Sequence, residues 1–216
     1  MSGYLSVFTP CVTEKVIERS RFIAHCAHTE NEEQARAFIA SIREEHSLAT
    51  HNCFAFVADK TGNLLRFSDD GEPQGTAGMP ILEVLKSKKL FETAVVVTRY
   101  FGGIKLGAGG LVRAYSGAAA DVLAKADIRK FCLCTKYTLS VGYDQTDFLK
   151  KFLDRGGFAA DSFDYADSVS ASVFIEDDKA EKFVLEITDA FCGRIKIGKG
   201  ESMYAPLSLK DGNSTQ

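Results

Sequence analysis

The stretch Val95–Leu123, VVVTRYFGGIKLGAGGLVRAYSGAAADVL, determines the local fold and contains the strongest candidate for a binding site. A β-branched run ends at Arg99, a loop with five glycines spans residues 102–110, and a helix opens at Leu111. Glycine lets a backbone approach a ligand closely, and the first N–H groups of a helix have no intrahelical partner. A strand, a glycine loop and a helix start in this order predict an anion-binding site.

The predicted site combines these loop glycines with side chains that carry positive charge or donate hydrogen bonds. Its members are Arg21, His51, Arg99, Tyr100, Gly102, Gly103, Lys105, Gly107, Gly109, Gly110 and Arg113. We expect Arg99, Lys105 and Arg113 to add mobile positive charge beside the loop. The alternative is that the small residues only let the helix pack tightly on the sheet, with Lys105 and Arg113 as solvated surface charges.

The glycine loop does not match the two common nucleotide-binding patterns. Gly102 and Gly107 have the spacing of a P-loop, but Ala108 stands where that motif needs lysine. Gly107 and Gly109 fit the beginning of a dinucleotide fingerprint, but Val112 replaces its third glycine. The loop is therefore predicted to bind an anion without belonging to either class.

A second glycine-rich segment, DDGEPQGTAG, precedes the helix expected from Pro80 to about residue 89. We predict that this loop lines the cleft, through Asp69, Asp70, Gly71, Glu72, Gly75, Thr76 and Gly78. Carboxylates beside such a turn could hold Mg²⁺ near a phosphate. The alternative is ordinary turn chemistry, and because no second set of oxygen ligands is evident, we expect no metal here.

The histidines and cysteines do not predict a metal or catalytic site. His25, Cys26 and His28 fall on one expected strand and His51 and Cys53 on another, without the CxxC or HxxxH spacings of zinc sites. We interpret His51 as a polar residue at the lip of the cleft, joined by Arg21. No Ser-His-Asp set or GxSxG motif is visible, so we expect no catalytic residue and no cofactor.

Composition narrows the classes of partner. The chain has 216 residues, a net charge of −3 and six cysteines, none of them in a CxxC pair, which is typical of a reducing cytoplasm. Residues 131–216 carry 10 basic and 14 acidic side chains, whereas residues 99–130 carry six basic and two acidic. The negative net charge of the whole chain excludes a general nucleic-acid binder. The excess of basic residues in 99–130 still allows a local basic patch. No apolar run approaches 18 residues, so no membrane span is expected.

Hydrophobic periodicity and turn residues predict an α+β chain with two domains. In residues 1–131 we expect strands over 9–17, 20–29, 51–58, 64–68 and 93–100, and helices over 31–46, 80–89 and 111–126. Residues 129–136 are interpreted as the boundary. Residues 138–204 follow the order βαββαβ, which is typical of a ferredoxin-like domain, placed at 132–206. Residues 207–216 are predicted to be a loose tail.

Three blocks, HNCFAFV, FSDDGEPQGTAGMPIL and VVVTRYFGGIKLGAGGLVRAYSGAA, resemble the signature blocks of the IMPACT family, most closely those of its short bacterial YigZ-type members. The resemblance implies an N-terminal domain like the second domain of a small-subunit ribosomal protein. It also implies a ferredoxin-like C-terminal domain like the last domain of elongation factor G. Longer eukaryotic members regulate translation during amino-acid starvation through an additional partner-binding domain, and we do not carry that role across.

Together, the residues and the resemblance predict a non-catalytic, cytoplasmic protein associated with translation. RNA or the ribosome is the expected partner, bound through the anion-binding groove, and no membrane contact is expected. Two alternatives stay open at this point. One is a sensor or enzyme for a small phosphorylated ligand, and the other is a protein-interaction module whose acidic C-terminal domain docks on a basic translation partner.

Overall fold

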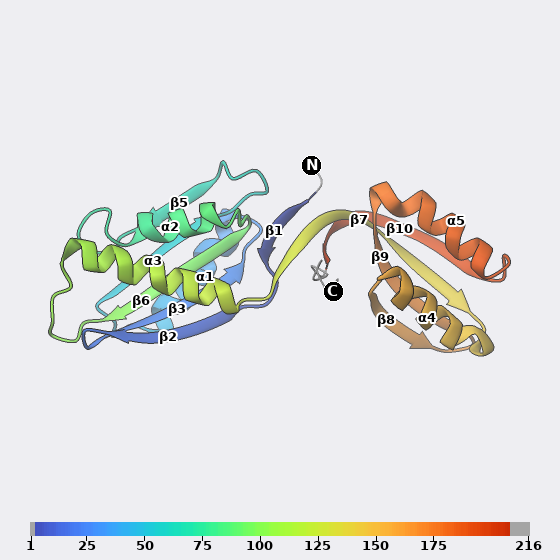
Figure 1. Cartoon of the computed structure of the whole chain (residues 1–216), viewed down its shortest axis with the longest axis horizontal. Coiled ribbons are helices and arrows are strands. Elements are labelled where there is room, and N and C mark those ends of the chain that lie inside the picture. The colour runs from blue at the N-terminus through green and yellow to red at the C-terminus, as the bar shows by residue number, and fades with distance from the viewer. Residues whose placement is uncertain (1–2, 208–216) are drawn as a thin grey trace, which may run out of the picture. The chain divides into compact units, whose positions relative to one another are not determined.

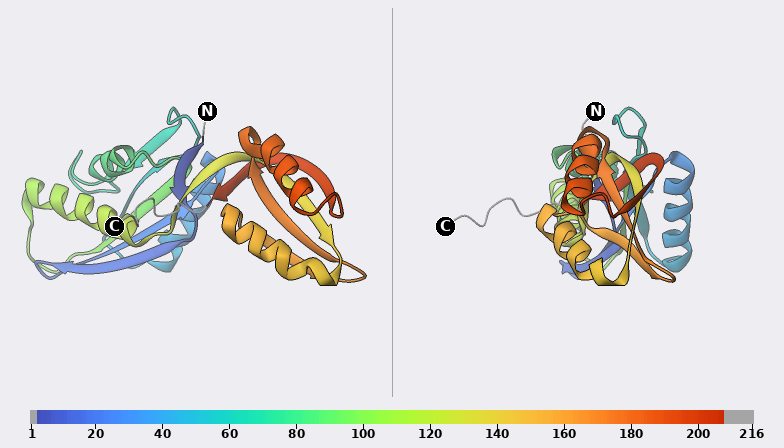
Figure 2. Two further views of the ribbon diagram at one scale, coloured as in Figure 1. Left: turned by 45° about the vertical axis from the view of Figure 1, so that its right-hand side comes forward. Right: turned by 90° about the vertical axis from the view of Figure 1, so that its right-hand side faces the viewer.

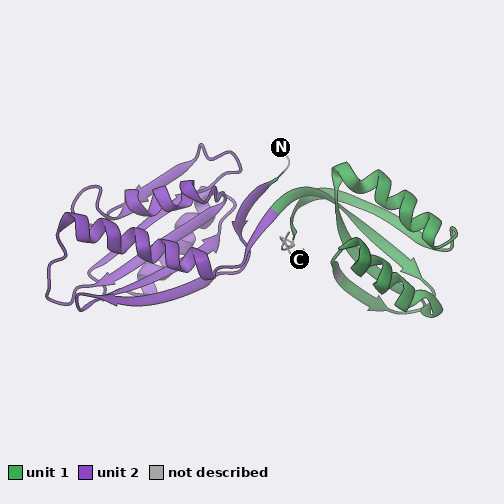
Figure 3. Cartoon of the chain, viewed as in Figure 1, with its two compact units in different colours: residues 1–3, 131–207 green, residues 4–130, 208–216 purple. Residues whose placement is uncertain are grey.

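The computed structural model describes residues 3–207 and divides the chain into two compact units (Figure 3). Residues 4–130 form one unit, and residues 131–207 build the other. Each unit contains an antiparallel sheet with helices packed on it, so the chain is an α+β protein.

The sheet of the 4–130 unit has the strand order β2-β3-β6-β4-β5. Its strands are β2 (Cys11–Ile17), β3 (Ser20–His28), β4 (His51–Val57), β5 (Leu65–Ser68) and β6 (Thr93–Tyr100). Glu18 and Arg19 connect β2 to β3, and both have positive φ, 44° and 63°. Positive φ at both positions is the conformation of a tight type I′ hairpin turn.

Helices cover both faces of this sheet (Figures 1 and 2). On β6, Val95 and Val97 pack into the core beneath α2 (Gly78–Ser87) and α3 (Gly107–Lys125). Their neighbours Ala94 and Val96 pack into a separate core beneath α1 (Glu32–Glu45). This alternation follows from the two-residue period of a strand, and burial of both faces explains why residues 94–97 of β6 form an uninterrupted apolar run.

Two features of the 4–130 unit differ from the sequence prediction. The strand β1 (Tyr4–Val7) was not predicted, and it pairs with β7, whose first residues belong to the same unit. The helix α3 begins at Gly107 instead of Leu111. The glycines at 107, 109 and 110 therefore form the first helical turn, which apolar periodicity could not detect because they have no side chain.

The second unit has the element order βαββαβ, as its sequence pattern predicts. Its elements are β7 (Ile128–Val141), α4 (Thr146–Gly156), β8 (Ala160–Tyr165), β9 (Val169–Glu176), α5 (Ala180–Ala190) and β10 (Lys196–Leu207). The strand order in the sheet of this unit is β10-β7-β9-β8. The helices α4 and α5 contribute Leu149, Phe183 and Ile187 to a core that they share with β7 and β9.

The division between the two units falls between Lys130 and Phe131, within the range 129–136. It lies inside β7, which begins at Ile128, whereas the sequence pattern predicts the first strand of the second domain only from residue 138. β10 includes Leu207, and the remainder of the tail predicted at 207–216 lies outside the described residues. Within residues 3–207, none of the helices has the length and apolar character needed to span a bilayer.

Candidate functional site

The start of α3 differs from the starts of the other two helices of its unit. Asn31 caps α1, because its side-chain oxygen accepts from the Gln34 N–H at 2.9 Å. At the start of α2, Asp69 Oδ1 accepts from the N–H groups of Ala77 and Gly78 at 3.0 and 2.8 Å. In the described residues, α3 has neither a side-chain cap at Leu106 nor an acidic residue in its first turn. Its first N–H groups therefore remain available to an outside acceptor.

Two cations lie at this helix start. Lys105 and Arg113 are exposed, and no ion pair to either is found within the described part of the chain. Arg113 lies along the first turn, since its Nη1 is 3.6 Å from the position that a Cβ on Gly109 would take. A lysine, an arginine and uncapped amides at one helix end make a local site of positive potential in a chain of negative net charge.

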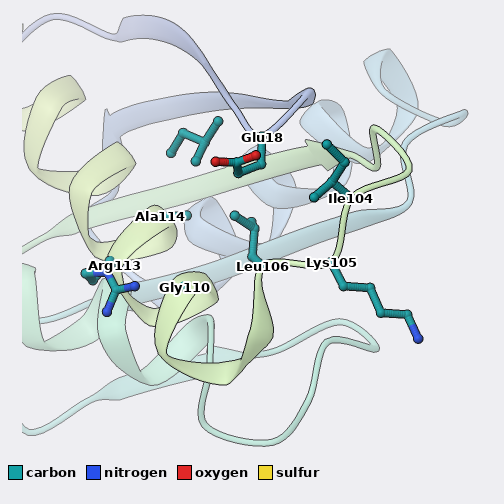
Figure 4. A pocket seen from close by; sticks show the side chains of 8 residues that line it. Glu18, Ile104, Lys105, Leu106, Gly110, Arg113 and Ala114 are labelled. Carbon is teal, nitrogen blue, oxygen red and sulfur yellow. The ribbon is translucent and has the colours of Figure 1, made fainter.

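One hollow at the start of α3 has a volume of about 420 Å³ and faces the β2–β3 turn (Figure 4). Ile104 and Leu106 give it aliphatic walls, and Glu18 adds a carboxylate. Figure 4 shows Lys105 extending away from Glu18. Lys105, Arg113 and Gly110 also line this hollow, so it combines two cations with one carboxylate.

A second hollow of about 350 Å³ lies on the other side of Leu106. Its lining includes Gly107 and Ala108 from the first turn of α3, together with Lys105, Phe101, Arg99 and Glu72. Gly102 brings the preceding loop close to the β2–β3 turn, since a Cβ there would lie 1.9 Å from the Arg19 carbonyl oxygen. This second hollow joins the first turn of α3 with two basic side chains, and the rest of its wall is apolar, formed by Pro73, Phe101, Leu106 and Leu111.

Arg99 is not the mobile charge that the sequence predicted. It is only 5% exposed, and its Nη1 donates to Glu72 Oε1 at 2.7 Å while its Nη2 donates to Ser20 Oγ at 3.3 Å. Tyr115 also donates to Glu72 Oε1, at 2.7 Å. The Nε of Arg99 is buried and has no hydrogen-bond partner among the described residues. Arg99 is thus a fixed guanidinium in the wall of the second hollow.

Arg21 and Tyr100 do not join the glycine loop. They are opposite each other in the β3–β6 register, on the sheet face that carries α1, whereas Arg99 shares the face of Val95 and Val97. Arg21 makes a two-pronged ion pair with Glu14, with N···O distances of 2.7 and 2.8 Å. The predicted cluster is therefore divided between the two faces of the sheet.

The acidic loop has a structural role at each of its carboxylates. Asp69 caps α2 and accepts from the Gly75 N–H at 2.8 Å, and Asp70 accepts from the Asn52 N–H and from Arg43 Nη2, both at 2.6 Å. Glu72 accepts from Arg99 and Tyr115. Of the predicted cleft-lining residues, only Glu72 lines the second hollow. Gly71 and Thr76 lie elsewhere in the loop, and Gly78 is the first residue of α2.

His51 and Cys53 are held by this same loop. His51 donates from Nδ1 to the Asp70 carbonyl at 2.8 Å, and its Nε2 lies 3.8 Å from Glu72 Oε1. Cys53 is fully buried and donates to the Asp69 carbonyl at 3.0 Å. Burial raises the pKa of the Cys53 thiol to about 12, so it is not an activated nucleophile.

Sequence reasoning missed two features of the site. The first is the ion pair between Glu72 and Arg99 with the Tyr115 hydroxyl, which joins three segments that are distant in the sequence. The second is Phe101, which is 46% exposed at the hollow, with the Arg99 guanidinium carbon 5.3 Å from its ring centre. A tyrosine among the small residues of α3 was the available signal for the first feature.

Comparisons with known proteins agree with the motif blocks. A family model described as the Impact N-terminal domain matches residues 18–123. The chain is 37% identical over 216 residues to "IMPACT family member YvyE" of Bacillus subtilis (strain 168), covering 100% of both chains. It is 37% identical over 199 residues to "IMPACT family member YigZ" of Escherichia coli (strain K12), covering 91% of this chain and 98% of that one. A solved structure described as "Crystal structure of an hypothetical protein" has a TM-score of 0.61 and 35% identity, covering 98% and 99% of the two chains.

Proposed function

The chain belongs to the IMPACT family, with full-length bacterial relatives, and on this premise we propose that it is a non-catalytic, cytoplasmic, translation-associated protein that binds RNA, free or on the ribosome. The proposed contact is the start of α3, defined by Lys105, the N–H groups of Gly107 and Ala108, and Arg113. The phosphate groups of RNA are the anions that this arrangement of cations and helix amides suits.

One observation carries the proposal. Of the three helices in the 4–130 unit, α1 and α2 begin with side-chain acceptors on their free amides, whereas α3 begins without one among the described residues. The same helix start has two exposed cations, Lys105 and Arg113, with no ion pair in residues 3–207. The exposed first turn would gain most from a bound anion, because a helix N-terminus favours negative charge by about 0.3–2 kcal/mol.

The architecture supports a link to translation at the level of fold. We infer that the 4–130 unit has the fold of the second domain of a small-subunit ribosomal protein. We also infer that the 131–207 unit is ferredoxin-like and similar to the last domain of elongation factor G. The element order βαββαβ and the strand order β10-β7-β9-β8 support the second inference.

Filter binding of short single-stranded RNAs across a salt series tests the proposed function. We expect the logarithm of the association constant to fall linearly with the logarithm of the salt concentration, because bound cations release counterions from phosphates. Lys105→Ala and Arg113→Ala should each reduce the steepness of this dependence by about one contact.

Lys125→Ala is the matched control, because it removes the same charge from the same helix. Lys125 is exposed in the last turn of α3, about 27 Å from Gly107 at 1.5 Å per residue, so its removal should leave the salt dependence unchanged. Equal effects of Lys105→Ala and Lys125→Ala would show that only overall charge matters. Absence of RNA binding by the unsubstituted chain would contradict the proposal.

A sensor for a small phosphorylated molecule is the second candidate, and the second hollow beside the first turn of α3 favours it. A volume of about 350 Å³ lies at the lower end of small-molecule sites. A thermal-shift screen of nucleotides and sugar phosphates distinguishes the two functions. A specific metabolite at 100 times its dissociation constant should add about 2.7 kcal/mol to the free energy of unfolding.

A further inference from the structure

We propose that the groove between α4 and α5 docks a short acidic segment of a partner protein, which places a bulky apolar side chain in the groove. The two helices pack on the same core of the 131–207 unit, and the groove between them has a volume of about 400 Å³ (Figure 1). It is lined by Phe148, Lys151, Phe152 and Arg155 of α4, by Phe158, and by Glu186 of α5. All of these residues belong to the 131–207 unit, so the inference does not depend on the proposed RNA contact in 4–130.

The apolar wall of the groove consists of three phenylalanine rings that rest on buried rings. Phe148 is 48% exposed, and its ring meets the ring of Phe191 edge-on with the centres 4.9 Å apart. Phe158 packs in the same way on Phe183, at 4.8 Å, and Phe152 lies within 6.5 Å of both buried rings. An apolar side chain that enters the groove would therefore remove aromatic surface from water without first having to order it.

The unpaired charges at the groove are both positive. Lys151 and Arg155 are exposed one helical turn apart on α4, and no ion pair to either is found within residues 3–207. The carboxylate that α5 contributes, Glu186, is paired with Lys182 at 3.5 Å. Carboxylates on either side of an apolar side chain would complement these two free cations, and this complementarity favours an acidic segment over a basic one.

The rest of the unit favours a peptide over a nucleic acid or a small molecule. Residues 131–216 carry 10 basic and 14 acidic side chains, which disfavours a strand with a negative charge at every phosphate. A peptide with a few carboxylates beside Lys151 and Arg155 meets less of this repulsion. Nearly half of the Phe148 side chain faces solvent, whereas small-molecule sites enclose most of their ligand. An apolar anchor presented by another protein suits such an open recess.

A nuclear magnetic resonance titration of the ¹⁵N-labelled full chain tests the inference. The probe is a peptide in which leucine and phenylalanine are flanked by aspartates on both sides, added up to millimolar concentration. One control peptide has alanines in place of the two apolar residues, and the other has lysines in place of the aspartates. We expect shift changes in α4 and α5, with the probe binding about tenfold more tightly than either control. No binding of the probe, or equal affinity for the lysine peptide, overturns the inference and leaves the proposed RNA function intact.

A pair of neighbouring lysines separates the groove from general charge. Lys151→Glu should weaken the probe about fivefold, because it replaces an unpaired cation of the groove with a like charge. Lys150→Glu makes the same change one residue earlier on α4, where the Lys150 ammonium lies over the rings of Phe163 and Tyr165 and does not line the groove. It should change the affinity by less than about twofold. Equal weakening by the two variants would overturn the inference.

Phe148→Ala tests the apolar contact and should weaken the probe about tenfold. Leu185→Ala is its control, since Leu185 is 66% exposed on α5 and does not line the groove. Two results would assign the groove to another occupant and overturn the inference. One is self-association of the chain, measured by sedimentation velocity, that Phe148→Ala abolishes. The other is displacement of the probe by a short single-stranded RNA.

Discussion

At the scale of single residues, the Glu72–Arg99 ion pair is the clearest case of a charge whose role depends on its surroundings. Both side chains are buried, at 3% and 6% exposure, and a buried charge that loses its partner is strongly destabilising. Glu72→Ala should lower the free energy of unfolding by about 3–5 kcal/mol, as measured by urea denaturation. Glu83→Ala, which breaks an exposed pair with Lys86, should cost less than about 1 kcal/mol. Similar costs for the two variants would refute this assignment.

A second residue-scale prediction concerns pH and the contact between His25 and His46. The two Nε2 atoms are 3.2 Å apart, and burial, followed by the charge of His46, lowers the pKa of His25 in the folded protein while Glu45 opposes the shift. The unfolded chain therefore takes up a proton first, near its ordinary pKa of about 6.5. Stability should fall as the pH drops below that value, down to the folded pKa.

The measurement is the free energy of unfolding between pH 7.5 and 5.5 for the unsubstituted chain and for His25→Asn. His28, whose pKa burial also lowers, contributes a slope of the same sign, and Glu92, whose pKa burial raises, contributes one of the opposite sign. The contribution of His25 is therefore the difference between the pH dependence of the unsubstituted chain and that of His25→Asn. A variant with the same pH dependence as the parent would show that His25 does not contribute.

The sequence could predict which residues carry charge at the site, but not how each charge is used. Strand alternation places Arg99 on the buried face with Val95 and Val97, and that period was visible in the sequence. Its partner Glu72 is 27 positions away in a loop, and no local pattern indicates that contact. The same alternation places Tyr100 on the opposite face, which is why the predicted cluster separates.

At the scale of elements, the loop before α2 acts as a cap contributed from outside the helix. Asp69 accepts from three backbone N–H groups, those of Gly75, Ala77 and Gly78. Asp69→Ala should lower the free energy of unfolding by about 2 kcal/mol or more, since a single lost cap costs about 0.5–2 kcal/mol. Hydrogen exchange should become faster at Ala77 and Gly78, whereas unchanged exchange there would contradict the capping role.

Elements with a strong period were predicted well, and elements made of glycine or mixed residues were not. The strand Thr93–Tyr100 has the bounds that the sequence indicates, and α1 begins after the predicted cap Asn31. The first turn of α3 was missed because glycine has no side chain and therefore adds no apolar position to the helical period. The start of β7 was missed because Arg129 and Lys130 precede its apolar residues. Charged residues at the start of a strand interrupt the apolar pattern from which the strand would be predicted.

At the scale of the whole molecule, the two units have separate hydrophobic cores. The cores beneath α2, α3 and α1 contain only residues from 4–130, and the core of α4 and α5 contains only residues from 131–207. Each unit therefore has its own source of stability, and local opening in one need not expose amides of the other.

Leu149→Ala tests this separation, because Leu149 is fully buried in the core of α4 and α5. Truncating a buried leucine costs about 2–5 kcal/mol, since the cavity is only partly refilled. Hydrogen exchange followed by mass spectrometry should show faster exchange in peptides from 131–207 and unchanged exchange in 4–130. Leu82→Ala, a matched substitution in the other core, should produce the reverse pattern. Faster exchange in both units from either variant would mean that the chain unfolds as one cooperative body, and any core substitution could then perturb the proposed contact at the start of α3.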